Sequence, residues 1–270
     1  DELLDMLDGL VISGGSDIDP ASYGALPHPE THGTRPERDR FELALALRAK
    51  LYAQPFYRLV YGESDGLPGL VLDRYGDVIV GQIGTAGMEA LKPAIAAAVA
   101  KVIGPQTLIW KNDSGARELE GLPSYVETAF GPAVAETVIE ENGVRFFVPM
   151  GHGQKTGWFY DQAANRSALL HYVRGARVLD VFCYLGAWGL AAARAGASEV
   201  LCVDSSAPAL DLLQRSASTN GLANVRTERA DAFDDLLHER RPQKAPALDL
   251  AELPFPLAGQ LGRLQHRVGD

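Results

Sequence analysis

The chain has 270 residues and a mass of 29.0 kDa, and 46% of its residues are hydrophobic while 22% are charged. These values exclude disordered, collagen-like and coiled-coil proteins, and they allow one large or two small globular domains. The net charge of −10 gives no electrostatic indication of nucleic-acid binding. No apolar run reaches the roughly 18 residues of a membrane span, and no secretory n-region or cysteine framework is visible. We therefore expect a soluble, reduced protein of the cytoplasm without a membrane partner.

Residues 1–50 predict a short buried strand over 7–13 that ends in a glycine-rich loop. After a polar stretch, the apolar positions of 37–50 predict a helix. Three motifs of this segment resemble the gamma-glutamyl-gamma-aminobutyrate hydrolase branch of the class I glutamine amidotransferases: Gly14-Gly15-x-Asp17-x-Asp19-Pro20, His28-Pro29-Glu30-Thr31 and Arg38-Asp39-x-Phe41-Glu42. The segment is therefore interpreted as an amidotransferase-like fragment.

This resemblance implies an oxyanion site shaped by the glycine pair, because backbone N–H groups approach a tetrahedral intermediate where no Cβ intrudes. The chemistry of that family also needs a cysteine on a sharp strand-to-helix turn. Cys183 and Cys202 lie in apolar runs without flanking glycines, so we interpret both as small core residues. A gamma-glutamyl hydrolase is kept as an alternative function. His28 and His32 lack a third ligand, so no metal site is predicted.

Residues 51–150 predict a smaller α+β domain. The expected elements are, in chain order, strands at 57–61, 70–75 and 78–83, a helix over 88–103, a strand at 107–111, and paired strands at 135–140 and 144–148. The last two strands are expected to form a hairpin, because Asn142-Gly143 is a strong signal for a tight two-residue turn. Taken by itself, the glycine-rich stretch 62–69 indicates an exposed turn between hairpin strands.

Two long motifs closely resemble bacterial large-subunit rRNA cytosine-C5 methyltransferases of the RlmI type. The first runs from Gly62 to Asp77, and the second runs from Gly153 through Asp161 to Arg166. The resemblance covers about residues 56–239. It implies an enzyme that uses S-adenosyl-L-methionine as its cofactor and binds large-subunit rRNA as its substrate.

Residues 151–240 predict a βαβαβ unit. A strand from Arg177 turns into a helix over 187–195, and a strand at 199–204, a helix at 207–218 and a strand at 225–229 follow. Such a unit forms a parallel sheet with right-handed crossovers. The expected fold class is therefore α/β, an incomplete Rossmann-like class I methyltransferase sheet preceded by the smaller α+β domain. Residues 241–270 are an unassigned tail.

Acidic residues fall at or near the carboxyl ends of these three strands, where ligands bind in open parallel sheets. Asp180 closes the first turn, Asp204 could accept both ribose hydroxyl hydrogens, and Asp231 could accept from an adenine amino group. Gly186 and Gly189 do not complete the three-glycine dinucleotide motif. This favours S-adenosylmethionine, whose sulfonium carries no phosphate that a helix N-terminus must hold.

The resemblance adds further residues on both sides of the first strand of this unit. Phe182 and Tyr184 are expected to flank the ligand, and a solvated helix charge is the alternative interpretation of Arg166. The full set of expected cofactor-binding residues is Thr156, Phe159, Asp161, Gln162, Arg166, Asp180, Phe182, Tyr184, Gly186, Asp204, Asp231 and Ala232.

Methylation of cytosine at carbon 5 needs a thiolate that adds to carbon 6 of the base. The family resembled supplies an Asp-Pro-Pro motif after the fourth strand and a nucleophilic cysteine further on, and this sequence contains neither, so no catalytic residue is assigned. The leading hypothesis is an S-adenosylmethionine-dependent rRNA methyltransferase with its catalytic half missing. A non-catalytic cofactor- or RNA-binding protein is the alternative. The strand beginning at Arg177 should have one unpaired side, which predicts marginal stability or self-association.

Overall fold

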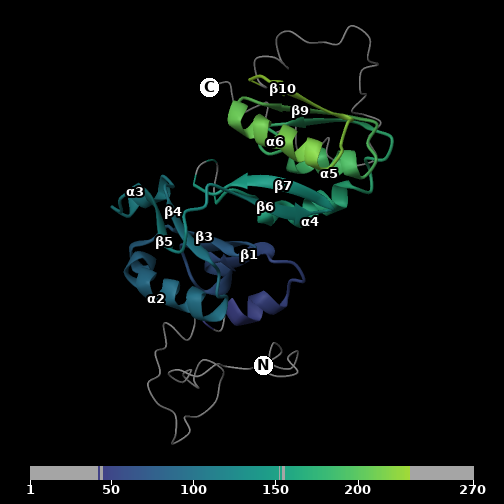
Figure 1. Ribbon diagram of the computed structural model, residues 1–270. Coiled ribbons are helices and arrows are strands. Elements are labelled where there is room, and N and C mark those ends of the chain that lie inside the picture. The colour runs from purple at the N-terminus through teal and green to yellow at the C-terminus, as the bar shows by residue number, and fades with distance from the viewer. Residues whose placement is uncertain (1–41, 43–44, 152, 154–155, 232–270) are drawn as a thin grey trace, which may run out of the picture. The chain divides into compact units, whose positions relative to one another are not determined.

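The computed structural model describes residues 42, 45–151, 153 and 156–231 (Figure 1). The motifs in residues 1–41, the predicted cofactor contact Ala232 and the tail lie outside the described residues. The chain divides into one compact unit over residues 1–230 and a second over 231–270, of which Asp231 alone is described. Among the helices of the described ranges, none is long and apolar enough to cross a membrane.

Residues 56–130 form a five-stranded sheet in the order β1-β2-β3-β4-β5. Neighbouring strands are antiparallel except β3 and β4, which run parallel and are joined by helix α2. The elements are β1 (Phe56–Tyr61), the short 3-10 helix η2 (Gly62–Asp65), β2 (Leu70–Tyr75), β3 (Val78–Ile83), α2 (Ala86–Val102), β4 (Thr107–Asn112), α3 (Ala116–Leu119) and β5 (Tyr125–Phe130). The strands and the long helix predicted here are confirmed, and β5 is an additional strand.

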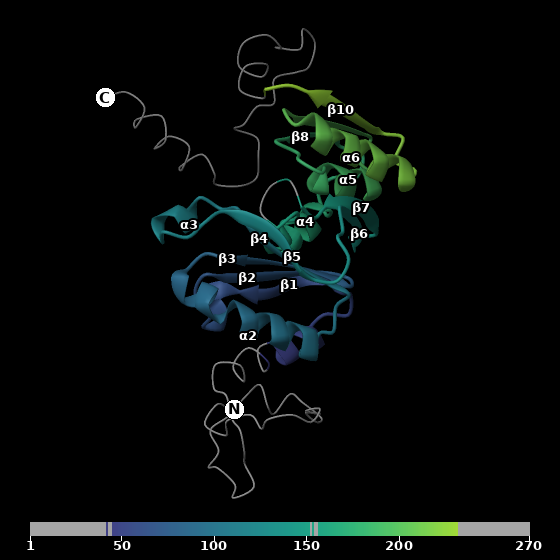
Figure 2. The same cartoon turned by 60° about the vertical axis from the view of Figure 1, so that its left-hand side comes forward.

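Helix α2 packs one face against this sheet (Figure 2). Thr85 caps its first turn, because the Thr85 hydroxyl accepts a hydrogen bond from the Met88 amide. Ile95 and Val99 of the helix are fully buried in the same apolar cluster as Leu108 of β4. Burial of this face, more than the helix propensity of its alanines, therefore holds α2 in place.

The predicted hairpin is confirmed. It consists of β6 (Glu136–Glu141) and β7 (Val144–Pro149), which form a separate two-stranded sheet. The turn residues Asn142 and Gly143 have φ values of 51° and 71°, as a type I′ turn requires. Phe146 of β7 is fully buried and packs at a tilt on Trp158, with 4.7 Å between the ring centroids. This packing fixes the hairpin against the segment that precedes the second large sheet.

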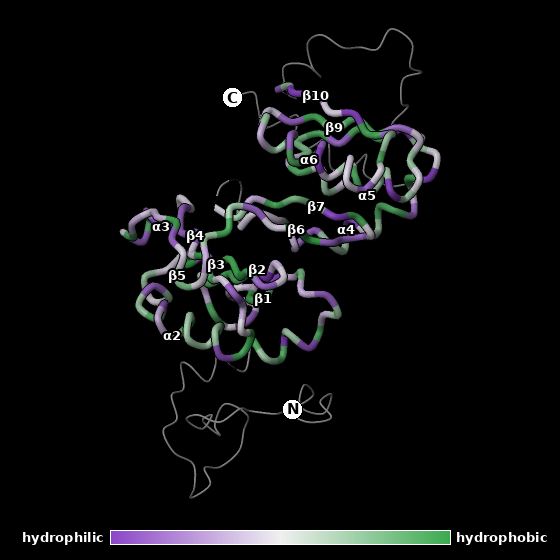
Figure 3. Tube along the Cα trace, in the orientation of Figure 1, coloured by the Kyte–Doolittle hydropathy of each residue, from purple (hydrophilic) through white to green (hydrophobic). Residues whose placement is uncertain are grey.

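Residues 177–229 form the predicted βαβαβ unit, and its three parallel strands lie in the order β10-β9-β8. Figure 3 shows β9 as hydrophobic along most of its length, which is typical of a buried parallel strand. The elements from residue 160 onward are η3 (Tyr160–Gln162), α4 (Ala163–Leu169), β8 (Arg177–Val181), α5 (Ala187–Arg194), β9 (Glu199–Asp204), α6 (Ala207–Thr219) and β10 (Val225–Arg229). The predicted α/β fold class is confirmed.

Strand β8 lies at the edge of this sheet in the described part of the chain, where it pairs with β9 alone. Leu179 on this strand is 50% exposed. The strand therefore has backbone groups along its open edge and an apolar side chain only partly covered on one face, as the sequence predicted. Self-association through this edge stays a prediction.

Candidate functional site

A cavity of about 160 Å³ lies where the carboxyl end of β8 meets the segment that leads into α4. It is lined by Trp158, Phe159, Gln162, Arg166, Phe182, Cys183, Tyr184, Leu185, Ala187 and Trp188. Five of the predicted cofactor residues thus meet in one place, although they come from two segments of the sequence. The lining is mainly aromatic, which suits a flat or cationic ligand group.

Two predicted acids hold the backbone around this cavity. Asp180 is buried at the end of β8 and accepts a hydrogen bond from the Gly189 amide at 2.8 Å. Asp204 accepts from the Tyr184 amide at 2.8 Å through one oxygen and from the Ser206 amide at 2.9 Å through the other. Burial raises the pKa of Asp180 to about 6. Asp204 therefore joins the loop after β8 to the loop after β9, where a ligand of this sheet would bind.

The loop after β8 holds two aromatic residues in an unusual backbone conformation. Phe182 and Tyr184 have φ values of 59° and 49°, in the left-handed region that larger residues seldom adopt. The Cys183 amide between them donates to the Val203 carbonyl at 3.1 Å and anchors the loop. Phe182 is 61% exposed, whereas Tyr184 packs edge-on against Phe159. Strain of this kind concentrates at ligand sites.

Arg166 is buried, so its interpretation as a solvated helix charge is wrong. Its guanidinium donates to both carboxylate oxygens of Glu141, at 2.5 and 2.7 Å, and to the Phe159 carbonyl at 3.0 Å. It also lies over the rings of Trp158 and Trp188, 5.2 and 6.0 Å from their centroids. Glu141 and the two tryptophans were not predicted. Glu141 precedes the hairpin turn, and that position gives no functional signal in the sequence.

Other predicted residues lie outside the cavity lining. Thr156 is fully buried, and its hydroxyl contacts Asp73 and Tyr75 of the five-stranded sheet. Asp161 is exposed and accepts from the Gln162 side chain at 3.3 Å. Gly186 caps the start of α5 with a φ of 73°, where an added Cβ would lie 2.5 Å from Leu213. The glycine therefore lets α5 begin close to α6, and its predicted contact with the cofactor stays a prediction.

Asp231 is the one described residue of the second unit, and it is exposed. Its predicted contact with an adenine amino group stays a prediction. In the described ranges, no three His, Cys, Asp or Glu side chains gather as metal ligands.

The two cysteines are core residues, as predicted. Cys183 and Cys202 are 4% and 0% exposed. The neighbouring Cys202 thiol, followed by burial, raises the pKa of Cys183. Both thiols are enclosed among core side chains, so neither cysteine is placed to attack a bound base.

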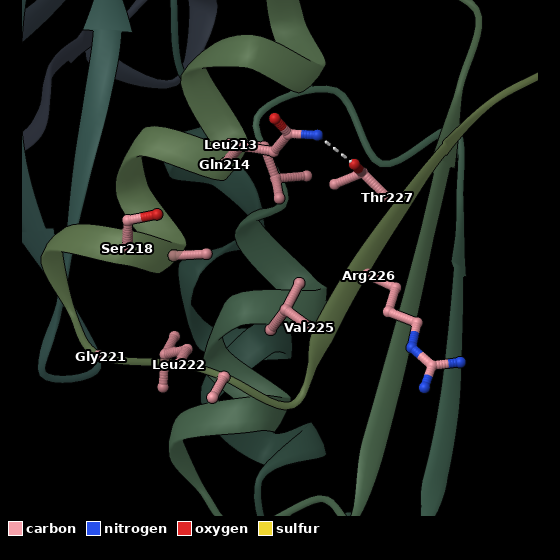
Figure 4. A pocket seen from close by; sticks show the side chains of 10 residues that line it. Leu213, Gln214, Ser218, Gly221, Leu222, Val225, Arg226 and Thr227 are labelled. Atoms are coloured by element: carbon pink, nitrogen blue, oxygen red, sulfur yellow. Dashed lines mark hydrogen bonds between the residues drawn. The ribbon is translucent and has the colours of Figure 1, made fainter.

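A larger cavity of about 690 Å³ lies between the C-terminal half of α6 and the start of β10 (Figure 4). Its lining mixes polar and apolar side chains, and the side-chain amide of Gln214 donates to the Thr227 hydroxyl within it. It lies at the amino end of β10, whereas ligands of open parallel sheets bind beyond the carboxyl ends of the strands. The smaller aromatic cavity is therefore the better candidate site.

Two protein families match parts of this chain. Residues 101–230 match the S-adenosylmethionine-dependent methyltransferases, and residues 1–59 match Peptidase C26. The second match covers the residues that carry the amidotransferase-like motifs. The first match includes the hairpin, the aromatic cavity and the whole βαβαβ unit.

Curated relatives and solved structures agree with the first match. The chain is 41% identical over 204 residues to ribosomal RNA large subunit methyltransferase I of Aeromonas hydrophila, which covers 74% of this chain and 51% of that protein. A protein from Streptococcus mutans described as an S-adenosylmethionine-dependent methyltransferase has a TM-score of 0.63 and 26% identity, over 73% of this chain and 52% of that chain. A methyltransferase complexed with S-adenosylhomocysteine has the same TM-score and coverage with 25% identity. The chain spans about half the length of the curated relatives it matches.

Proposed function

We propose that this chain, whose residues 101–230 match the S-adenosylmethionine-dependent methyltransferases, binds S-adenosyl-L-methionine in the aromatic cavity and serves the methylation of large-subunit rRNA. The observation that carries the proposal is the placement of Asp180 and Asp204 at the carboxyl ends of two adjacent parallel strands, beside that cavity. The rRNA substrate is supported by the curated relatives, whose names specify it. An rRNA substrate implies a cytoplasmic location.

The side chains around the cavity fit this cofactor. Each Asp204 oxygen accepts one backbone N–H, and its second lone pair is suited to a ribose hydroxyl. The rings of Phe159 and Tyr184 suit the adenine plane or the sulfonium charge. Arg166, whose charge is balanced by Glu141, offers an N–H donor for the carboxylate of the methionine part. The bound cofactor supplies an electrophilic methyl group, and the residues of this chain hold and orient it.

The finer assignment to carbon 5 of cytosine rests on the resemblance of the two long motifs. That reaction needs a thiolate that reaches carbon 6 of the base. Cys183 and Cys202 are the two cysteines of the sequence, and both are buried. We therefore propose that this chain alone binds the cofactor without transferring the methyl group.

Calorimetry with S-adenosylhomocysteine and a tritiated methyl-transfer assay on rRNA test both parts of the proposal. We expect stoichiometric binding of S-adenosylhomocysteine, no binding of NAD as the dinucleotide control, and no incorporation of label by this chain alone. Absence of S-adenosylhomocysteine binding would overturn the cofactor assignment. Incorporation of label would overturn the non-catalytic role and leave the cofactor assignment intact.

Self-association is proposed to use the outer edge of β8. We expect sedimentation velocity to show an oligomer whose population rises with protein concentration, because an open strand edge pairs with another copy. Leu179→Lys should lower that population, since a lysine on an edge strand opposes pairing. A monomer at every concentration, with a sharp and reversible thermal transition, would contradict this prediction.

A further inference from the structure

One wall of the aromatic cavity is formed by a segment that is bound on its other side to the five-stranded sheet. We call residues 156–162 the wall segment. Trp158, Phe159 and Gln162 of this segment line the cavity. Thr156 and Tyr160 do not, and both are buried against β2. The wall segment therefore connects the aromatic cavity to the five-stranded sheet.

The wall segment is attached at its start to the acidic partner of an ion pair between two strands of the sheet. Arg58 of β1 donates to both carboxylate oxygens of Asp73 on β2, at 2.9 and 3.0 Å. Asp73 has no exposed surface. The Thr156 hydroxyl donates to the same carboxylate at 2.5 Å. A hydrogen bond to a carboxylate is stronger than one between two neutral groups, so the wall segment begins at a fixed point.

A chain of hydrogen bonds extends this attachment along the wall segment. The Trp158 amide donates to the Tyr75 hydroxyl at 3.0 Å, and that hydroxyl donates to Thr156 Oγ1 at 3.1 Å. Two residues later, the Tyr160 hydroxyl donates to the Arg74 carbonyl at 2.9 Å. Bonds linked in one direction strengthen one another in a dry environment. Three consecutive residues of β2 thus hold alternate residues of the wall segment.

We propose that Asp73 is a positioning residue for the cofactor site, acting through Thr156 and Tyr75 to hold the wall segment in its binding conformation. The inference rests on the proposed function and deepens it, because it gives the five-stranded sheet a part in cofactor affinity. Burying a carboxylate carries a desolvation penalty, and apolar side chains would pack the wall segment against β2 without that penalty. Directional hydrogen bonds instead fix where Trp158 and Phe159 stand.

The test compares two threonines in the full chain. Thr156→Val removes the hydroxyl that joins Asp73 to the wall segment, and Thr107→Val removes an equally buried hydroxyl that donates to the Pro132 carbonyl at 3.0 Å. We expect calorimetry to show about fivefold to tenfold weaker S-adenosylhomocysteine binding for Thr156→Val, because the hydrogen bonds that its hydroxyl makes with Asp73 and Tyr75 are both lost. Thr107→Val, which loses one hydrogen bond to a neutral carbonyl, should also lower the melting temperature but keep the affinity within about twofold. Thr156→Ser, which retains the hydroxyl, should restore the affinity.

Hydrogen exchange in the ligand-free protein provides a second readout. Thr156→Val should accelerate exchange of the amides of the wall segment, and Thr107→Val should leave them unchanged. If the wild-type chain binds S-adenosylhomocysteine, two results would overturn the positioning role of Asp73. These are an unchanged affinity in Thr156→Val, or an equal loss of affinity in Thr156→Val and Thr107→Val. Failure of the wild-type chain to bind S-adenosylhomocysteine would instead overturn the proposed function, and the cofactor role of Asp73 with it.

Discussion

Asp204→Ala is expected to weaken S-adenosylhomocysteine binding by at least about 30-fold, because two charge-assisted hydrogen bonds to ribose hydroxyls would be lost together. The substitution also removes the acceptor of the Tyr184 and Ser206 amides. Tyr184 lines the cavity, so the loop after β8 should lose part of its preorganisation. Calorimetry measures the combined effect as a change in Kd.

Two further variants separate these contributions. Asp204→Asn keeps one side-chain oxygen as an acceptor but loses the charge, so its affinity should fall between those of the wild type and Asp204→Ala. Asp211 is an exposed acid on α6, and Asp211→Ala removes the same charge outside the cavity. We expect Asp211→Ala to bind S-adenosylhomocysteine with an affinity within about twofold of the wild type, because solvent and salt screen an exposed charge outside the cavity. Equal affinity of Asp204→Ala and Asp211→Ala would contradict the assignment of Asp204.

The parts of the structure that the sequence predicted are those set by local patterns. The βαβαβ order follows from apolar runs of strand length that alternate with helical segments, and the hairpin follows from Asn142-Gly143. The positions of Asp180 and Asp204 were predictable for the same reason, because each acid ends an apolar strand. Strand β5 was missed because its central residues are exposed, so no alternation of buried and exposed residues marks it.

The parts that were not predicted depend on contacts between distant segments. Thr156 is 83 residues from Asp73, and the pattern of apolar residues contains no information about such a pairing. Thr156 was recognised from a motif but expected to contact the cofactor. In the structure its hydroxyl contacts the sheet. The same limit applies to Arg166, whose partner Glu141 lies on the hairpin, 25 residues earlier in the chain.

The ion pair between Glu141 and Arg166 gives the prediction with the largest effect on stability. Glu141→Ala is expected to lower the free energy of unfolding by about 3–5 kcal/mol, because it leaves the buried guanidinium of Arg166 without its counter-charge. The indole N–H of Trp158 would lose its acceptor as well, since it donates to the same carboxylate at 3.1 Å. Urea unfolding followed by circular dichroism measures this change.

An exposed ion pair between the hairpin and α6 provides the matched control. Glu136 on the same strand accepts two hydrogen bonds from Arg215, at 2.8 and 2.9 Å, and the Arg215 side chain is 52% exposed. Glu136→Ala should lower the free energy of unfolding far less than Glu141→Ala, because solvent screens such a pair and keeps the remaining charge hydrated. Equal losses in the free energy of unfolding for Glu136→Ala and Glu141→Ala would contradict the claim that burial makes the Glu141–Arg166 pair the more important one.

A double variant distinguishes the cost of an unpaired charge from the loss of packing. Glu141→Leu with Arg166→Met replaces the buried ion pair by apolar side chains, and such replacements are often close to neutral. We expect it to be more stable than Glu141→Ala, although the Trp158 indole and the Phe159 carbonyl still lose their partners. Its affinity for S-adenosylhomocysteine should nevertheless fall, because Arg166 lines the cavity. Recovered stability with lost binding would show that the buried arginine serves the ligand, since a purely structural pair could be replaced without loss of affinity.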